Sequence, residues 1–536
     1  MIRNIPLLSL VAMLPLGAMA DVRPSVLFSD NMVIQRETQA PVWGAADPGE
    51  QVTVSASWGA SASATAGQDG KWMLKLATPE AGGPHTLTIQ GNNTIEISNV
   101  LSGEVWFCSG QSNMDFSMQQ LSTSSKRTRP EFVPQAGYIN QEINTAEDAL
   151  LRQFTVTKQT SPLEPLERLE GEWFASTPQK NGNFSATAYF FGRELRQRLQ
   201  VPVALIESAY GGTQVEPWMP AEMFDHDPEM ADYYTDKVAE VRPKLENWDP
   251  VKVKQDYQTA LEKWQANKQG RKPKMAADPA ANKQFPSTLF NGMVHPVIPY
   301  AIKGVIWYQG ESNAKHNTLQ YEANFRAMIR GWRARWGQGA FPVYFAQLAN
   351  WKSPATEPVE SDGWASVCDQ QRRTLGLKHT GMAVLHDTGE AGDIHPHNKM
   401  DVGKRLALWA LKHDYDQPIA VWSGPLYKSH SIQGDQVVIS FDSVGSGLMV
   451  GHKPAMGETE ASDAPLKHFQ ICGADRQWFW AEATISGNNT VTVSHPEVPA
   501  PTVVRYAWAR NAGTANLYNK EGLPASIFTT EADIPK

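Results

Sequence analysis

The sequence predicts an α/β fold in which helices cover both faces of a parallel sheet and β-rich regions flank that sheet at both ends. Residues 103–420 alternate short apolar runs with stretches of helical periodicity. Residues 21–102 and 421–536 instead show short alternating stretches that are broken by Gly, Pro and Asn. We therefore expect two antiparallel, sandwich-like β regions around a central domain that carries the parallel sheet.

Length and composition agree with several packed domains. The chain has 536 residues, which is too many for one hydrophobic core. Hydrophobic residues make up 41% and charged residues 19%, as in an ordinary folded protein. The net charge of −8 argues against a nucleic-acid partner, because phosphate binding needs a surplus of Lys and Arg. A polar, Lys-rich stretch at about 220–285 is interpreted as a helical insertion in the central domain.

Short apolar runs bounded by turn-forming residues predict the strands of the parallel sheet. A helix is predicted between the strands at Gly304–Tyr308 and Val343–Ala346, because apolar side chains recur at spacings of three and four from Phe325 to Trp336. Gly337 is the expected end of that helix. The predicted strands are Val105–Cys108, Val203–Ile206, Gly304–Tyr308, Val343–Ala346 and Met382–Leu385.

The first 20 residues differ from the rest of the chain. Arg3 gives a positive start, residues 6–16 are an apolar run, and residues 18–20 supply a small-residue cleavage site. We expect a signal peptide that is cleaved before Asp21, and hence a secreted or periplasmic protein. No later run approaches the roughly 20 apolar residues that a membrane span needs.

Unusual polar loops follow four of the five predicted strands. Ser112 lies in a turn of small residues at 109–114, and paired glycines lie at 208–213. Residues 309–313 contain a carboxylate and two amides, and residues 392–397 contain Asp and His. Because ligands bind at the carboxyl ends of the strands in open parallel sheets, we expect these loops to form one site.

The four loops contain the parts of a serine nucleophile site. Such a site needs a base that takes the serine proton, a carboxylate that orients the base, and donors for the oxyanion. Each loop alone is a weak indication, since a serine in a glycine-rich turn is usually only part of the turn. Their joint placement at strand ends is the stronger observation.

Several separated blocks of the sequence carry a family resemblance. They are Gly110–Met114, Gly211–Thr213, Trp307–Asn313, Asp393–Pro396 and the stretch from Leu289–Met293 through Pro299–Tyr300. Together they resemble the sialate O-acetylesterases, a branch of the SGNH (GDSL-like) serine hydrolases, over about residues 24–420. The resemblance implies an SGNH-type three-layer α/β/α hydrolase domain and an N-terminal β-domain. It also implies release of acetate from O-acetylated carbohydrates without a metal or organic cofactor.

The resemblance assigns roles residue by residue. Ser112 matches the nucleophile and His395 the general base. The oxyanion donors would be the N–H group of Ser112, a glycine N–H group from Gly211 or Gly212, and the side chain of Asn313.

The carboxylate that orients the base is left open between two residues. SGNH enzymes usually place an Asp three residues before the His, and here that position is Gly392. Asp393 stands two residues before His395, and relatives whose strand ends in Gln-Gly-Glu can use that Glu, which is Glu311 here. Both remain candidates.

Which acetylated sugar is the substrate stays open at this point. Gln111 and Gln309 lie in the predicted site loops and are weak candidates for substrate contacts. A sialate carboxylate would call for cationic residues, for which Arg372 and Arg373 are weak candidates. Similar proteins include acetylesterases of xylan and other plant polysaccharides, so these substrates are an alternative.

Two other classes of protein compete with the serine esterase. Asp393, His395 and His397, with His386 nearby, could form the site of a metal-dependent hydrolase. The serine loop and Pro396 between the histidines argue against that reading. A non-catalytic carbohydrate-binding protein would suit the β regions and the 18 Trp, but would leave the four strand-end loops as coincidence.

Overall fold

One long strand joins the N-terminal β region to the central sheet. The computed structural model describes residues 21–124 and 133–533, and the expected signal peptide at 1–20 lies outside them. Strand β8 (Thr94–Gly110) runs unbroken through the expected domain boundary at 102. Its first half pairs with β2 (Val33–Gln35) and β7 (Gly82–Gln90), and its second half enters the parallel sheet. The two regions therefore share one continuous backbone element.

The central sheet has the strand order β10-β9-β11-β8-β12-β13-β14. All neighbours are parallel except β10, which pairs antiparallel with β9 at one edge. The other strands are β9 (Asp148–Val156), β10 (Gly171–Ser176), β11 (Val203–Ala209), β12 (Gly304–Tyr308), β13 (Val343–Ala346) and β14 (Thr380–Ala383).

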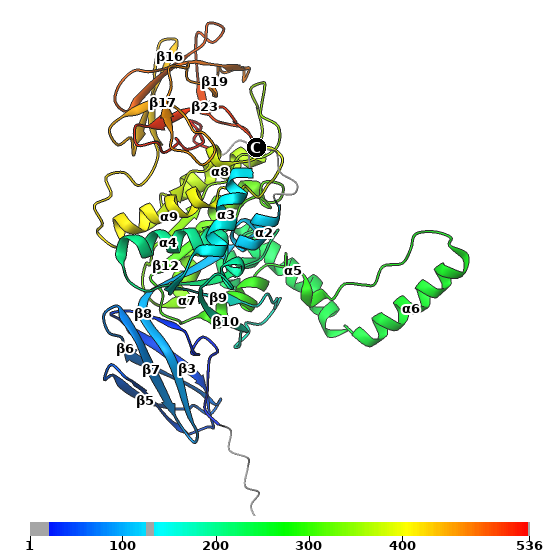
Figure 1. Ribbon diagram of the computed structural model, residues 1–536. Helices are drawn as coiled ribbons and strands as arrows, with labels where there is room; N and C mark the ends of the chain where they lie inside the picture. The colour runs from blue at the N-terminus through cyan, green and yellow to red at the C-terminus, as the bar shows by residue number, and fades with distance from the viewer. Residues whose placement is uncertain (1–20, 125–132, 534–536) are drawn as a thin grey trace, which may run out of the picture.

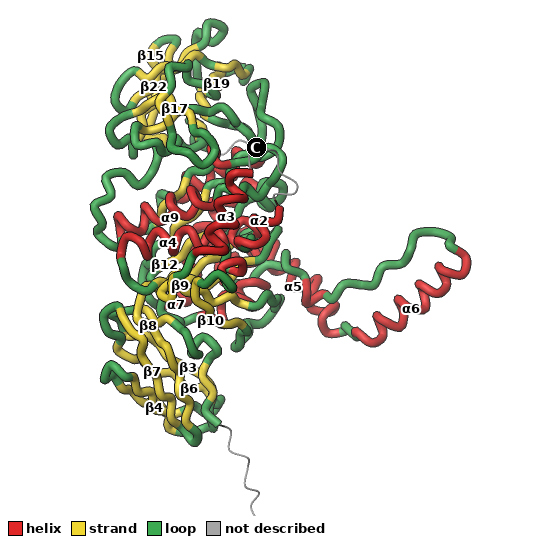
Figure 2. Tube along the Cα trace, in the orientation of Figure 1, coloured by secondary structure: helices red, strands yellow, loops and turns green. Residues whose placement is uncertain are grey.

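Helices cover both faces of this sheet, as predicted (Figures 1 and 2). Side chains of β8 alternate between two hydrophobic clusters, with Val105 and Phe107 in one and Trp106 and Cys108 in the other. Helices α7 and α8 contribute to the first cluster, and α1 to α4 and α9 to the second. Their bounds are α1 (Ser112–Asp115), α2 (Met118–Ser124), α3 (Val133–Thr145), α4 (Ala186–Leu199), α7 (Tyr321–Trp336), α8 (Gly363–Thr374) and α9 (Lys399–His413).

Two of the five predicted strands have the expected bounds, two are longer than expected, and one is shifted. The longer strands are β8, expected at Val105–Cys108, and β11, expected at Val203–Ile206. Strands β12 and β13 have the predicted ends, and α7 ends where Gly337 adopts a left-handed conformation with φ 67°. The prediction of Met382–Leu385 was wrong by two residues, because β14 spans Thr380–Ala383. Its first two residues, Thr and Gly, pair with β13 although they carry no apolar signal.

The two outer β regions are antiparallel apart from the pairing of β2 with β8. The remaining N-terminal strands are β1 (Arg23–Pro24), β3 (Gln39–Ala45), β4 (Gln51–Ala56), β5 (Ser61–Thr65) and β6 (Lys71–Ala77). The C-terminal region forms separate small sheets. They consist of β15 (Leu426–Gln433), β16 (Gln436–Asp442), β21 (Glu482–Ile485) and β22 (Thr490–Ser494); of β17 (Leu448–His452), β18 (Glu460–Ala461) and β24 (Leu517–Asn519); and of β19 (Phe469–Cys472), β20 (Trp478–Trp480), β23 (Val503–Tyr506) and β25 (Phe528–Thr529).

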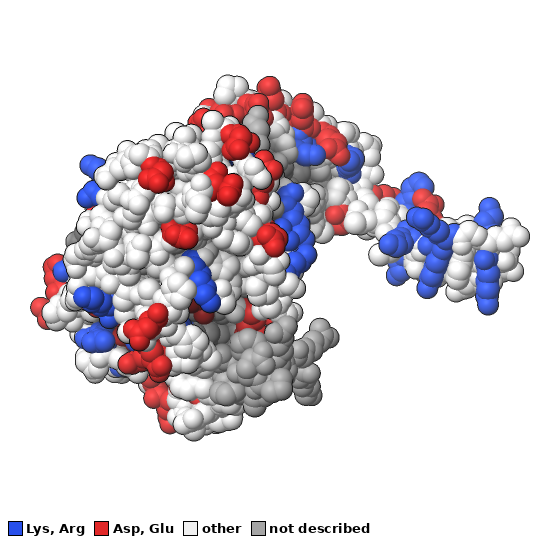
Figure 3. Space-filling model, turned by 90° about the horizontal axis from the view of Figure 1, so that it is seen from above, with Lys and Arg blue, Asp and Glu red and all other residues white. Residues whose placement is uncertain are grey.

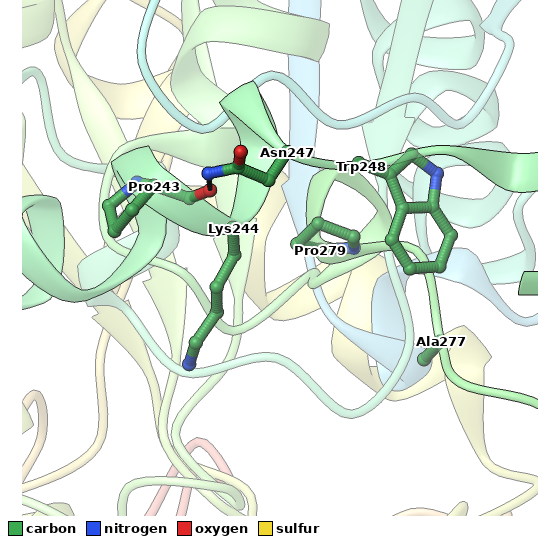
Figure 4. Close-up of a pocket in the computed structure, with 6 residues that line it drawn as sticks. All are labelled: Pro243, Lys244, Asn247, Trp248, Ala277 and Pro279. Atoms are coloured by element: carbon green, nitrogen blue, oxygen red, sulfur yellow. Dashed lines mark hydrogen bonds between the residues drawn. The ribbon is translucent and has the colours of Figure 1, made fainter. Parts of the chain in front are cut away.

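The polar stretch around 220–285 contains two helices that project from the body as an arm (Figure 1). They are α5 (Pro228–Glu246) and α6 (Pro250–Asn267), and no side chain of α6 is buried. Lys and Arg side chains gather on the arm (Figure 3). A hollow at the C-terminal end of α5 is lined by residues that include Trp248 and Lys244, none of which is a predicted site residue (Figure 4). Among the described helices, none is both long and apolar enough to cross a membrane.

A buried arginine connects the N-terminal region to the parallel sheet. Arg152 of β9 donates hydrogen bonds to the carbonyl oxygens of Asn31, at 2.8 Å, and Asn99, at 2.6 Å. It also donates to the Asn99 side-chain oxygen at 3.0 Å. Burial lowers the pKa of Arg152 to about 10, so the guanidinium stays charged at neutral pH.

We expect Arg152→Met to lower the free energy of unfolding by about 2–4 kcal/mol, because the two carbonyl groups lose their donor. The matched control is Arg198→Met, which removes an exposed pair with Glu194 and should change the free energy by about 0.5 kcal/mol or less. Urea unfolding followed by Trp fluorescence measures both. Equal effects would show that Arg152 does not hold the two regions together.

Candidate active site

Ser112 is the first residue of α1 and comes two residues after the end of β8. The turn lies directly against β12, where the Gln111 N–H group donates to the Tyr308 carbonyl oxygen at 2.9 Å. Gly110 has a φ of 139°, and a Cβ atom there would collide with the Tyr308 backbone. Glycine at this position therefore permits the close approach that presents the Ser112 hydroxyl at the strand end.

His395 lies within hydrogen-bonding distance of that hydroxyl. Its Nε2 atom is 2.9 Å from Ser112 Oγ, although the two residues are 283 positions apart in the chain. The Phe116 ring stacks on the imidazole, with ring centroids 4.2 Å apart and planes 18° from parallel. The stacked ring restricts the plane of the imidazole, and the contacts of Nε2 with Ser112 and of Nδ1 with Asp393 fit one orientation of the ring within that plane.

Asp393 is the carboxylate on the other side of the imidazole. Its Oδ1 atom is 3.3 Å from His395 Nδ1 and accepts a hydrogen bond from the His395 backbone N–H group at 2.8 Å. Burial by itself would raise the pKa of Asp393, but the hydrogen bonds from His395 outweigh burial and lower that pKa below its usual value. Asp393 is therefore ionised at neutral pH.

Glu311, the competing carboxylate, bonds to a different part of the site. It accepts hydrogen bonds from the side-chain amides of Gln111 and Asn113, and its closest polar partners do not include the His395 ring. Burial raises the pKa of Glu311, against the lowering effect of the Asn113 hydrogen bond. Of the two carboxylates, the geometry therefore supports Asp393 as the partner of the base.

The turn of paired glycines lies beside Ser112, whereas the buried Asn313 side chain bonds to other parts of the protein. A Cβ atom on Gly211 would lie 3.3 Å from Ser112 Cβ, and Gly212 has a φ of 73°. The Gly211 N–H group donates to Asp115 Oδ2 at 3.2 Å. The Asn313 amide donates to Glu216 at 3.1 Å and to a carbonyl oxygen at 3.4 Å. These bonds argue against Asn313 as an oxyanion donor.

The four weak candidates for substrate contacts bond to the protein itself. Gln111 bonds to Glu311, and Gln309 donates to the Thr213 carbonyl oxygen at 3.0 Å; both glutamines are buried. The contacts of Arg372 and Arg373 suit a structural role instead. Both pair with the buried Asp369, and Arg373 also donates to the backbone at 531 and 532, so these arginines attach α8 to the C-terminal region.

The histidines of the rival metal site have other partners. His397 Nδ1 lies 2.8 Å from Glu390 Oε1, and His386 Nε2 lies 3.0 Å from the Ala525 carbonyl oxygen. Within residues 21–124 and 133–533, no group of three or more His, Cys, Asp or Glu side chains is arranged to hold a metal ion. The alternation of these side chains in the sequence therefore does not become a convergent donor set in the fold.

Sequence reasoning missed several residues around the Ser112 turn. Lys158 pairs with Asp115 at 2.7 Å, and Lys283 donates to the Gly211 carbonyl oxygen at 2.6 Å. Neither lysine stands in a motif that could have marked it. Lys399 is fully buried and falls in phase with the apolar side chains Val402 and Leu406 of α9. A lysine within an apolar stripe predicts a buried charge, and this signal could have marked Lys399.

Comparisons with known proteins show the family of the chain. Residues 102–412 match the family described as "Carbohydrate esterase, sialic acid-specific acetylesterase". Sialate O-acetylesterase from Rattus norvegicus is 28% identical over 98% of this chain and 97% of that protein. The Homo sapiens protein of the same name is 27% identical over 94% of this chain and 92% of that protein. The crystal structure of a carbohydrate acetylesterase from Xanthomonas citri is 35% identical with a TM-score of 0.76, covering 96% of this chain and 100% of that one.

The family match covers more than half of the chain, and the likeness to the Xanthomonas citri structure extends over nearly all of it. It includes the four loops that meet at the carboxyl ends of the parallel strands. The chain therefore belongs to the carbohydrate esterase family of sialic acid-specific acetylesterases, and it is a carboxylic ester hydrolase.

Proposed function

We propose that this protein is an exported O-acetylesterase that hydrolyses acetyl esters on sugars through Ser112, His395 and Asp393. The observation that carries the proposal is the 2.9 Å contact between His395 Nε2 and Ser112 Oγ, with Asp393 on the opposite ring nitrogen. A serine hydroxyl becomes nucleophilic when a base accepts its proton, and the base works best when a carboxylate stabilises the imidazolium. Export rests on the predicted signal peptide, and a mature protein that starts at Asp21 would support it.

The reaction follows from this geometry in two halves. Ser112 Oγ attacks the acetyl carbonyl carbon while His395 takes the serine proton, and the sugar oxygen leaves with that proton. Water then attacks the acetyl carbon while His395 takes a proton from the water; the bond to Ser112 Oγ breaks, His395 returns the proton to Ser112 Oγ, and acetate leaves. The N–H groups of Ser112 and of the Gly211–Gly212 turn are the proposed oxyanion donors. The Gly211 N–H group, which donates to Asp115 in this structure, would donate to the oxyanion during the reaction.

Cationic side chains beside the glycine turn support an acidic sugar as the substrate. Lys283 Nζ lies 4.8 Å and Lys158 Nζ 5.5 Å from the centre of the Tyr210 ring, and Tyr210 directly precedes the turn. Asp115 neutralises Lys158, while the bond from Lys283 is to an uncharged carbonyl group. The site therefore offers a positive charge near the reacting ester, which suits the carboxylate of O-acetylated sialic acid better than neutral acetylated xylan.

Acetate release from 9-O-acetylated sialic acid and from acetylated xylan, measured side by side, tests this proposal. We expect a higher kcat/KM for the sialic acid ester. Lys283→Met should lower that value about tenfold and leave a small neutral acetyl ester nearly unchanged, whereas Lys263→Met on the arm should change neither. Faster turnover of xylan would make the protein a plant-polysaccharide acetylesterase instead. Equal losses on both kinds of ester would mean that Lys283 supports only the turn.

A further inference from the structure

The side chain of Asn113 connects the nucleophile turn to the loop of the base. Asn113 directly follows Ser112, and its Nδ2 atom donates a hydrogen bond to the Ile394 carbonyl oxygen at 3.1 Å. Ile394 directly precedes His395. The Asn113 backbone oxygen also accepts a hydrogen bond from Thr187 at 2.8 Å. Buried Asn113 therefore links the residue after Ser112 to the residue before His395, and the proposed proton transfer runs between Ser112 and His395.

Two ionisable side chains determine which way this amide points. Glu311 Oε1 accepts from Asn113 Nδ2 at 2.5 Å, and Lys399 Nζ donates to Asn113 Oδ1 at 2.5 Å. A flipped amide would turn its N–H groups toward the ammonium and its oxygen toward the carboxylate and the Ile394 carbonyl group. Only one orientation satisfies all three partners, so the donor to Ile394 is held in place.

The amide bridges these two side chains from different parts of the fold. Glu311 follows β12 and Lys399 begins α9, and both are buried. Burial lowers the pKa of Lys399 to about 7, against the attraction of Glu311, Glu390 and Asp393. Ionisable groups in the interior destabilise the fold unless they are well bonded. Buried polar networks that are fully bonded make a local geometry unique.

We propose that Asn113, Glu311 and Lys399 are positioning residues that set the distance between Ser112 Oγ and His395 Nε2. The inference rests on the proposed function, because it concerns the same serine and histidine. It gives Glu311 a role other than orienting the imidazole. The three residues act on the nucleophile turn and on the backbone before His395, and their described hydrogen bonds are to groups other than the two reacting atoms.

We expect Asn113→Ala and Lys399→Met each to lower kcat for a small acetyl ester by roughly 10²-fold, because a displacement of about 1 Å between reacting groups has an effect of that size. KM should change less than about threefold. The matched control is Lys453→Met, which removes a similarly enclosed lysine that pairs with Asp401 at 2.9 Å outside this cluster. Its kcat should stay near the wild-type value.

Two further readouts separate positioning from general loss of structure. The rate at which a fluorophosphonate labels Ser112 should fall in parallel with kcat, while the melting temperature shows that the variant is folded. The double variant Asn113→Ala/Lys399→Met should lose little more than the worse single variant, because residues that act as one unit are not additive. If Asn113→Ala does not fold, Asn113→Asp preserves the volume of the side chain and removes the donor.

Several outcomes would overturn the inference. They are an unchanged kcat in the folded variants, a loss that appears only in KM, and single losses that multiply in the double variant. Full activity of Ser112→Ala would instead overturn the proposed function, so the two failures are distinguishable. A fall in kcat with unchanged labelling of Ser112 would also contradict positioning of the nucleophile.

Discussion

Replacement of Ser112 with alanine is expected to lower kcat for acetate release by about 10⁴-fold or more, because the attacking atom is removed. The Ser112 hydroxyl is the group that His395 contacts, and no new steric conflict arises when it is deleted. Acetate release from a small acetyl ester, with the melting temperature as a check on folding, measures the effect.

The matched control for this substitution is Ser109→Ala, three residues earlier in β8. Within the described residues the buried Ser109 hydroxyl has no hydrogen-bond partner, so its removal should leave both kcat and stability nearly unchanged. Substantial acetate release by folded Ser112→Ala would refute the serine mechanism. Loss of that remaining activity on chelation, with recovery on addition of zinc, would then favour the metal-dependent hydrolase.

Asp393→Asn is expected to lower kcat by about 10²-fold or more, toward the roughly 10⁴-fold loss known for such a change in a serine triad. An asparagine amide can donate to His395 Nδ1, and the imidazole then carries its proton on Nε2. In that tautomer Nε2 cannot accept the proton of Ser112. Steady-state kinetics on a small acetyl ester measures the loss, and Asp463→Asn at an exposed position is the control.

The same substitution should change the dependence of stability on pH. A carboxylate whose pKa is lowered in the folded state stabilises the fold above its ordinary pKa and loses that contribution as the pH falls through the lowered value. The acid-induced decrease in stability below about pH 4 should therefore be smaller in Asp393→Asn. If Asp393→Asn retains full kcat while Glu311→Gln abolishes it, Asp393 is not the residue that orients His395.

Elements with a strong local signal were predicted well. The strands Gly304–Tyr308 and Val343–Ala346 are apolar runs between turn residues, and the helix that ends before Gly337 has a clear apolar stripe. In these segments, the apolar residues that mark the element in the sequence are also the residues that pack in the core, so the local pattern and the tertiary structure agree. The strand at Thr380–Ala383 was placed two residues late, since pairing with β13 recruits residues that lack the apolar signal.

Partners that depend on long-range packing were not predictable. Asn313 bonds to Glu216, and Arg372 pairs with Asp369. An amide and a cation are also residue types that an active site would use, so the sequence favoured a role in the site for both. A sequence pattern shows that an amide or a cation is present but not which neighbour uses it. Lys399 and Asn113 meet across 286 positions of the chain, and no local pattern records that contact.

The sequence by itself predicted that four strand-end loops form one site, and its resemblance to a family predicted that Ser112 and His395 act as a pair. Chain periodicity is sufficient for the joint placement of the loops, because the ends of parallel strands lie at one edge of the sheet, and the pair of residues follows from the resemblance of short motifs. Only the tertiary structure decided which carboxylate reaches the imidazole. Asp393 lies beside His395 Nδ1, while Glu311 is turned toward Gln111 and Asn113, because the backbone path of each loop directs its side chain.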